Sequence, residues 1–90
     1  MKVEWMPEAL AQLERVYDYI ATDSEPAARR LAETILKETD CLGVHPNLGR
    51  PGGRRNSREL IIGRYVITYR IRDRIEILSV VHGARRKNAR

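Results

Sequence analysis

The hydrophobic positions of this chain repeat with two different periods, one in each half of the sequence. Between residues 8 and 22, apolar side chains recur every three or four positions, which is the spacing of one helix face. Pro7 precedes this stripe and suits a first helical turn, because its missing N–H would be unpaired there. A second stripe of the same period begins at Pro26 and ends at Leu42, where Gly43 permits a left-handed stop. The polar break between the stripes predicts an antiparallel helical hairpin.

The period changes to two in the second half of the chain. A loop rich in proline and glycine is expected at 45–56. A period of two also occurs near the start of the chain, where polar and apolar residues alternate at Lys2–Trp5 and predict a short strand. Three strand-like runs follow the loop, at Ser57–Ile62, Arg64–Arg72 and Arg74–His82. The order strand, helix, helix and three antiparallel strands (βααβββ) predicts a two-layer α+β fold, and residues 1–90 are expected to form it as a single domain.

Strict alternation along the predicted strands divides their side chains between two faces. One face packs on the helical hairpin, and the other keeps Val66, Leu78 and Val80 as an apolar strip with arginines around it. Such a strip is a candidate site for a partner. The aromatic residues expected in the core are Trp5, Tyr17, Tyr65 and Tyr69, and Cys41 is expected there as a small buried hydrophobe.

Charge is distributed unevenly along the chain. Residues 1–45 carry five Lys/Arg and nine Asp/Glu, net −4, whereas residues 46–90 carry twelve and three, net +9, and the whole chain has a net charge of +5. A basic half of this kind attracts nucleic acid, an acidic protein or an anionic membrane surface, and charge alone does not choose among these partners.

Several classes of protein are excluded by composition. No apolar run approaches the roughly 18 residues of a membrane span, and the first ten residues contain acidic side chains and no cleavage site, so we expect a cytoplasmic protein that does not contact membranes. A single cysteine, Cys41, forms no internal disulfide. With His45 and His82 it gives no zinc-ligand spacing, so neither a metal nor a cofactor is expected.

Short motifs along nearly the whole chain occur in the order and spacing of one toxin superfamily. They are WMPEAL at Trp5–Leu10, Tyr19-Ile20, His45-Pro46 to Gly49-Arg50, Arg58-Glu59-Leu60, Tyr65 with Tyr69-Arg70-Ile71, and VVHGARR at Val80–Arg86. Together they resemble the ParE/RelE superfamily of toxins from type II toxin–antitoxin systems, and the VHGARR ending is most similar to the ParE branch. The resemblance implies the fold predicted above and a role in plasmid stabilisation.

The two branches of this superfamily differ in their targets. RelE-type toxins cut messenger RNA on the ribosome, with basic side chains that support phosphoryl chemistry. Aligned on Tyr65, this chain has Val66 where those nucleases carry an arginine, and Ser57 and Glu59 where the RelE prototype has lysines. The resemblance therefore favours the ParE branch, whose members bind and poison DNA gyrase and are neutralised by a ParD-type antitoxin.

The sequence thus predicts binding sites and no catalytic residue. The resemblance implies an effector contact, with gyrase and with gyrase-bound DNA, at His82 and in the basic tail at 84–90, at Arg85, Arg86, Lys87 and Arg90. We expect the antitoxin to bind the apolar strip and its arginines, namely Arg58, Arg64, Val66, Arg70, Leu78 and Val80. Two alternatives stay open. One is a RelE-type ribonuclease that uses His82 and Arg85 in catalysis, and the other is a basic nucleic-acid-binding module.

Overall fold

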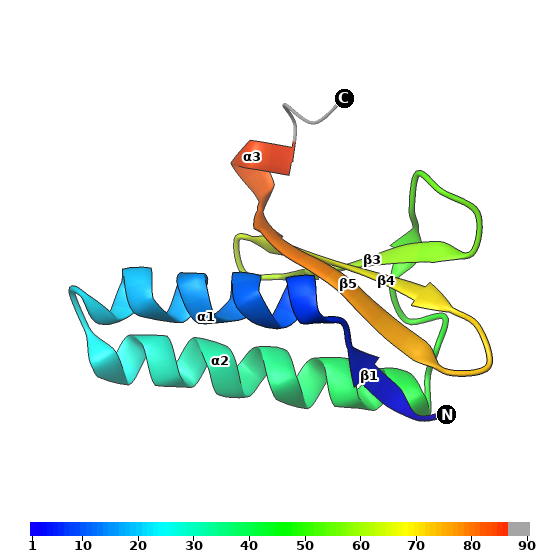
Figure 1. Ribbon diagram of the computed structural model, residues 1–90, viewed down its shortest axis with the longest axis horizontal. Coiled ribbons are helices and arrows are strands. Elements are labelled where there is room, and N and C mark those ends of the chain that lie inside the picture. Colours follow the sequence, from blue (N-terminus) through cyan, green and yellow to red (C-terminus); the bar gives the residue numbers. More distant parts are fainter. Residues whose placement is uncertain (87–90) are drawn as a thin grey trace.

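Two helices cover one face of a five-stranded sheet in the computed structural model of the protein (Figure 1). The structure describes residues 1–86, with side chains up to residue 84. The helices are α1 (Pro7–Ala21), α2 (Glu25–Asp40), the 3₁₀ turn η1 (Cys41–Gly43) and the short α3 (Gly83–Arg86). The strands are β1 (Val3–Trp5), β2 (Arg50–Pro51), β3 (Ser57–Ile62), β4 (Tyr65–Ile71) and β5 (Ile75–His82). The predicted two-layer α+β fold is confirmed.

The helical hairpin turns at the polar break that the sequence predicts. Ser24 caps α2, because its side-chain oxygen accepts a hydrogen bond from the backbone N–H of Ala27 at 3.2 Å. A serine cap of this kind stabilises a helix by about 1 kcal/mol. The Tyr17 hydroxyl of α1 donates a hydrogen bond to the Glu25 carboxylate of α2, so side chains from both helices hold the turn.

The strands lie in the order β1-β5-β4-β3-β2, so the first and last strands of the chain are neighbours. β1 runs parallel to β5, and the other pairs are antiparallel. The two-residue β2 was not predicted, because it lies in the proline-rich loop. It pairs with β3 only at Arg58 and Glu59, and Pro51 is tolerated there because an edge strand need not donate every ladder hydrogen bond.

The core lies between the helical hairpin and the inner face of the sheet. Its fully or nearly fully buried members are Ala9, Ile35, Leu42, Leu60, Ile62, Ile67, Tyr69, Ile75, Ile77 and Val80. Trp5 and Tyr65 pack against this cluster, so the predicted core positions of Trp5, Tyr65 and Tyr69 are confirmed. Tyr17 is instead half-buried at the hairpin turn.

The prediction of a buried Cys41 is wrong. The α-helical period stops at Asp40, and the tighter 3₁₀ turn that follows rotates the next side chains. As a result Cys41 faces solvent, and Leu42 beside it is fully buried.

A β-bulge in β5 interrupts the alternation of inner and outer side chains. Thr68 of β4 lies opposite Ser79, but the next residue, Tyr69, lies opposite Ile77. Leu78 is therefore an extra residue on β5 with no direct partner on β4. A bulge of this kind shifts the phase of every side chain beyond it.

Because of this shift, Val66, Leu78 and Val80 do not form the apolar strip that the sequence predicts. Val80 points toward the helices and is 2% exposed in the core. Val66 lies on the other face, where its partner on β5 is Val81. The Gln12 side chain of α1 accepts a hydrogen bond from the backbone N–H of Val80 at 2.7 Å, so the helical layer satisfies a backbone group beside the bulge.

Candidate functional site

The face of the sheet that points away from the helices (Figure 1) is here called the outer face. The strand pairing gives it three rows of side chains. The strand register sets the members of each row opposite one another. The first row is apolar and contains Ile61, Val66 and Val81; the second is polar and contains Glu59, Thr68 and Ser79; the third contains Ser57, Arg70, Glu76 and Glu4.

Ion pairs hold Arg70 of the third row and Arg74 beside it. Glu76 is 3% exposed and accepts hydrogen bonds from Arg70 Nε at 2.9 Å and Arg70 Nη2 at 2.7 Å. Its other carboxylate oxygen lies 2.9 Å from Arg74 Nη2, and Arg74 Nε lies 2.9 Å from Glu4 Oε1. The hydrogen bonds from Arg70 lower the pKa of Glu76 below its ordinary value of 4.5, although burial opposes this shift.

A second buried carboxylate lies in the middle row. Glu59 is 5% exposed, and its Oε1 lies 3.2 Å from both Nε and Nη2 of Arg50 on β2. Ser57, two residues earlier on β3, uses its hydroxyl to donate to the backbone oxygen of Arg54 at 2.7 Å. By the resemblance given above, the RelE prototype has lysines at these two positions. In this chain they hold an ion-paired carboxylate and a hydrogen-bonded hydroxyl.

An apolar hollow of about 430 Å³ lies at the end of the outer face, where β3, the turn after it and the start of α3 meet. It is lined by Arg50, Ile61, Gly63, Arg64, Val66, His82, Gly83 and Ala84. Ile61 is 48% exposed although it is apolar, and two arginines stand on the rim. Within residues 1–86, the outer edge of β3 beside Ile61 has no strand partner, because β2 covers only the start of β3.

The hollow brings together only part of the antitoxin site predicted from the sequence. Arg64 and Val66 line it. Ile61 and Arg50, which the sequence analysis did not select, line it with them. The sequence places Ile61 on a predicted strand. Only the observed strand register shows that it lies opposite Val66.

The other predicted antitoxin residues lie elsewhere. Arg58 points to the face that carries Tyr69, and its Nη1 donates to the backbone oxygen of Gly49 at 2.6 Å. Arg70 is bound to Glu76, Leu78 is the bulge residue, and Val80 lies in the core. These residues therefore do not form one surface with the hollow.

The predicted effector contact begins at His82 and continues beyond the described side chains. The His82 ring lies edge-on to Tyr65 with ring centres 5.4 Å apart, and its Nδ1 accepts a hydrogen bond from the N–H of Ala84 at 3.2 Å. Arg85 and Arg86 belong to α3, but their side chains lie outside the described part of the structure, as do residues 87–90. The effector role of the tail stays a prediction.

The described residues hold neither a candidate metal site nor a helix that could span a membrane. Among them, no three or more His, Cys, Asp and Glu side chains gather in a way that would hold a metal ion. None of the described helices has both the length and the apolar character needed to cross a bilayer.

The comparison with protein families identifies the class of protein that this two-layer fold represents. The model of the ParE toxin of the type II toxin–antitoxin system parDE matches residues 3–87. The chain therefore belongs to the ParE toxin family of type II toxin–antitoxin systems.

Two relatives are named as toxins, and a solved structure shares the fold. A protein named "Putative toxin Y4kP" from Sinorhizobium fredii is 37% identical over 83 residues, which cover 90% of this chain and 86% of that protein. Toxin RelE2 of Caulobacter vibrioides is 33% identical over 85 residues, covering 93% of this chain and 97% of that protein. The structure of a chromosomal ParDE toxin–antitoxin system from P. aeruginosa has the same fold, with a TM-score of 0.80 at 23% identity, over 91% of this chain and 95% of that chain.

Proposed function

We propose that the protein inhibits DNA gyrase by binding it, and that a ParD-type antitoxin neutralises it. The observation that carries this proposal is the set of closed ion pairs on the outer face. Cleavage of RNA requires cations that are free to stabilise a phosphorane. Here Arg50 is bound to Glu59, and Arg70 and Arg74 are bound to Glu76. A face whose arginines are already paired favours a binding function over a nuclease function.

The basic end of the chain supports contact with an acidic or phosphate-bearing target. Its cations follow β5 directly and are carried by Arg85, Arg86, Lys87 and Arg90. The planar guanidinium group of arginine pairs bidentately with carboxylates and phosphates. We therefore propose that His82 and this tail contact gyrase, with gyrase-bound DNA as an adjoining contact.

The apolar hollow supports the antitoxin part of the proposal. An extended acidic segment would pair its backbone with the open edge of β3, bury an apolar side chain beside Ile61 and set a carboxylate near Arg64. The P. aeruginosa structure of the same fold is described as a ParDE toxin–antitoxin system, which supports a partner of this class.

A gyrase supercoiling reaction tests both parts. The purified protein should stop supercoiling and accumulate cleaved DNA, and a ParD-type antitoxin should restore supercoiling. The Ile61→Lys variant should inhibit gyrase like the wild type but require at least about tenfold more antitoxin for rescue, because a charge replaces the apolar anchor. The matched control is Leu10→Lys, a residue of similar exposure, 46%, on α1. It should be rescued like the wild type.

The outcomes separate the alternatives. Normal supercoiling with excess protein would overturn gyrase as the target, and equal rescue of both lysine variants would overturn the hollow as the antitoxin site. The RelE-type alternative is kept because one relative is named RelE2. It predicts cut messenger RNA in a translation extract, with cleavage lost in His82→Ala and in Arg85→Ala.

A further inference from the structure

The arginines of the described residues differ in whether they have a partner. Arg29, Arg50, Arg70 and Arg74 form ion pairs with carboxylates. Arg54 and Arg55, in the segment between β2 and β3, are exposed and have no ion pair among the described residues. This segment, residues 52–56, is here called the arginine loop. The chain from His45 to Arg58 contains four arginines and no Asp or Glu, and the next residue, Glu59, is paired with Arg50.

Hydrogen bonds within the arginine loop fix its conformation. The Ser57 hydroxyl donates to the Arg54 carbonyl at 2.7 Å and accepts from the Arg54 N–H at 3.1 Å, and the Gly52 N–H donates to the Ser57 carbonyl at 2.8 Å. Gly52 is required, because a Cβ at this position would lie 2.6 Å from Ser57 Oγ. Asn56 has a φ of 61°, and its carbonyl accepts the N–H of Ile71 at 3.0 Å. The two arginines are therefore presented on a fixed turn, which reduces the entropy lost on binding.

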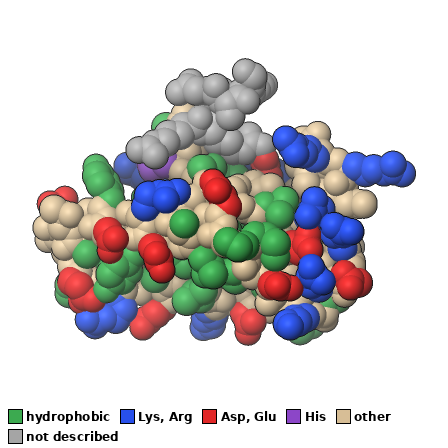
Figure 2. Space-filling model, viewed as in Figure 1, with side chains coloured by type: hydrophobic (Ala, Val, Ile, Leu, Met, Phe, Trp, Pro, Cys, Tyr) green, Lys and Arg blue, Asp and Glu red, His purple; other side chains and the backbone are tan. Residues whose placement is uncertain are grey.

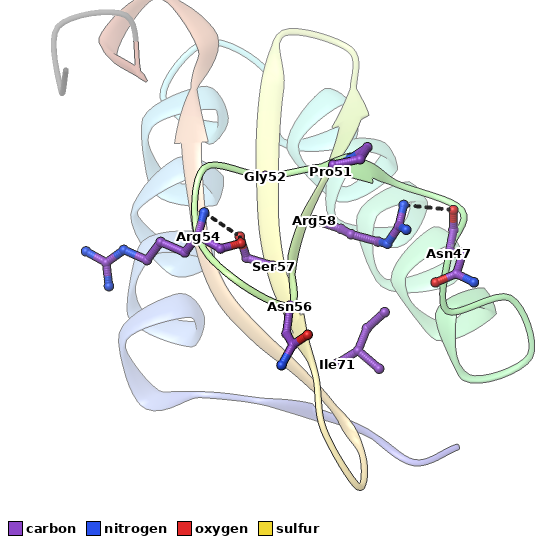
Figure 3. Close-up of a pocket in the computed structure, with 8 residues that line it drawn as sticks. All are labelled: Asn47, Pro51, Gly52, Arg54, Asn56, Ser57, Arg58 and Ile71. Carbon is purple, nitrogen blue, oxygen red and sulfur yellow. Dashed lines mark hydrogen bonds between the residues drawn. The ribbon is translucent and has the colours of Figure 1, made fainter.

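A cavity of about 380 Å³ lies beside this loop (Figure 3). Its lining residues are Asn47, Pro51, Gly52, Arg54, Asn56, Ser57, Arg58 and Ile71, and none of them is acidic. In Figure 3 the side chains of Asn47, Asn56 and Arg58 lie around the space with Ile71, while the Arg54 side chain points away from it. Arg58 is held in place by the Gly49 carbonyl. Two carboxamides and a guanidinium can all donate hydrogen bonds, so the cavity is suited to an anion.

We propose that the arginine loop and this cavity bind the phosphate backbone of duplex DNA. One phosphate occupies the cavity beside Asn56 and Arg58, and neighbouring phosphates contact Arg54 and Arg55. Figure 2 shows Lys and Arg side chains extending from the end of the molecule that carries this loop. The proposal rests on the proposed function in one respect only, that gyrase supplies the DNA in the cell.

The distribution of aromatic residues favours duplex DNA over a single strand. Proteins that bind single strands stack the bases on exposed aromatic side chains. The aromatic residues of this chain are Trp5, Tyr17, Tyr19, Tyr65 and Tyr69. Tyr69 is fully buried, Trp5 and Tyr65 pack on the core, and the exposed Tyr19 lies near the end of α1, far from the arginine loop (Figure 1). The loop therefore offers phosphate contacts without stacking partners, as backbone recognition of a duplex requires.

A binding titration tests the proposal without gyrase. The purified full chain is added to a labelled duplex of about 20 base pairs, and fluorescence anisotropy measures binding at several salt concentrations. Each phosphate contact contributes about −0.9 to the slope of log K against log salt concentration. Arg54→Ala/Arg55→Ala should therefore make the slope shallower by about 1.8. Arg29→Ala/Arg30→Ala on α2 removes the same charge from another adjacent pair of exposed arginines and should leave the slope unchanged.

A second variant separates the cavity from general positive charge. Asn56→Gly keeps the net charge and tolerates the positive φ, but removes a donor to the phosphate. It should weaken duplex binding about tenfold. The proposal is overturned if the two double variants change the slope equally, if Asn56→Gly binds like the wild type, or if a single-stranded RNA of equal length binds more tightly than the duplex. Inhibition of supercoiling is measured separately, so a failure here leaves the proposed function standing.

Discussion

Tyr69 connects the centre of the sheet to the segment that precedes β2. Its side chain is fully buried, and its hydroxyl donates to the Pro46 carbonyl at 2.7 Å and accepts from the Gly49 N–H at 2.8 Å. A Cβ at Gly49 would lie 2.7 Å from the Glu59 carbonyl and 2.8 Å from the Tyr69 hydroxyl, so only glycine fits there. The motif from His45-Pro46 to Gly49-Arg50 therefore has a structural role: it docks a loop onto one buried tyrosine.

Removal of this hydroxyl should destabilise the protein measurably. Tyr69→Phe leaves a buried N–H and a part-buried carbonyl without their partner, so we expect the free energy of unfolding to fall by about 2–3 kcal/mol in urea denaturation. Tyr65→Phe is the matched control, because the Tyr65 hydroxyl forms no hydrogen bond among the described residues. Its effect should stay within about 0.5 kcal/mol. Equal losses in the two variants would contradict the docking role.

At this scale the sequence predicts which side chains are buried better than what their polar atoms contact. The alternation along β4 predicts an inward Tyr69, and the structure confirms it. Its partners lie 20 and 23 residues earlier, in a loop whose path no local pattern specifies. The same limit applies to Arg58, which the sequence assigns to a partner and the structure binds to Gly49.

Among the secondary-structure elements, the bulge in β5 has the largest effect on the surface. It turns Val80 inward and leaves Val81 beside Val66 on the outer face. Alternation did not predict it, because both faces of β5 carry apolar residues and neither phase stands out. The helices, by contrast, have one strong stripe each, and their extents follow the sequence within one or two residues at most ends.

The link between α1 and the bulge is testable through Gln12. Gln12→Met keeps the length of the side chain but removes the oxygen that accepts the Val80 N–H. We expect a loss of about 1–3 kcal/mol in the free energy of unfolding and faster hydrogen exchange at the Val80 amide. Arg15→Met introduces the same new side chain at an exposed site on the same helix. Its exchange rate at Val80 should match the wild type, and a shared acceleration would contradict the specific role of Gln12.

Across the whole molecule, the uneven charge of the chain is partly neutralised by contacts between distant segments. Glu4 at the start of the chain lies beside Arg74, and Glu76 binds both Arg74 and Arg70. The net charge of the basic half therefore overstates the number of cations available to a partner. Among the described side chains of the basic half, Arg54, Arg55, Arg58, Arg64 and Arg72 form no ion pair with a carboxylate.

This ionic row should make stability depend on acidity. The pKa of Glu76 is lowered in the folded state, so its contribution is present above the ordinary value of 4.5 and is lost as pH falls from there through the folded pKa. Glu76→Gln should therefore melt at a lower temperature than the wild type near neutral pH, and the difference should shrink below pH of about 4.5. Glu38→Gln, exposed on α2, is the control and should follow the wild-type curve. A Glu76→Gln difference that stays constant from about pH 3 to pH 7 would contradict this account.

The pairing of β1 with β5 has a consequence for the synthesis of the protein. Val3, Glu4 and Trp5 are made first, yet their strand partners are Ile75, Glu76 and Ile77. β5 lies between β1 and β4, so β1 has no neighbour in the sheet until β5 has left the ribosome. Contacts this distant in sequence form late in folding. A nascent chain interrupted before codon 75 lacks the strand that joins β1 to the rest of the sheet, so the toxin fold is completed only after β5 has been synthesised and has left the ribosome.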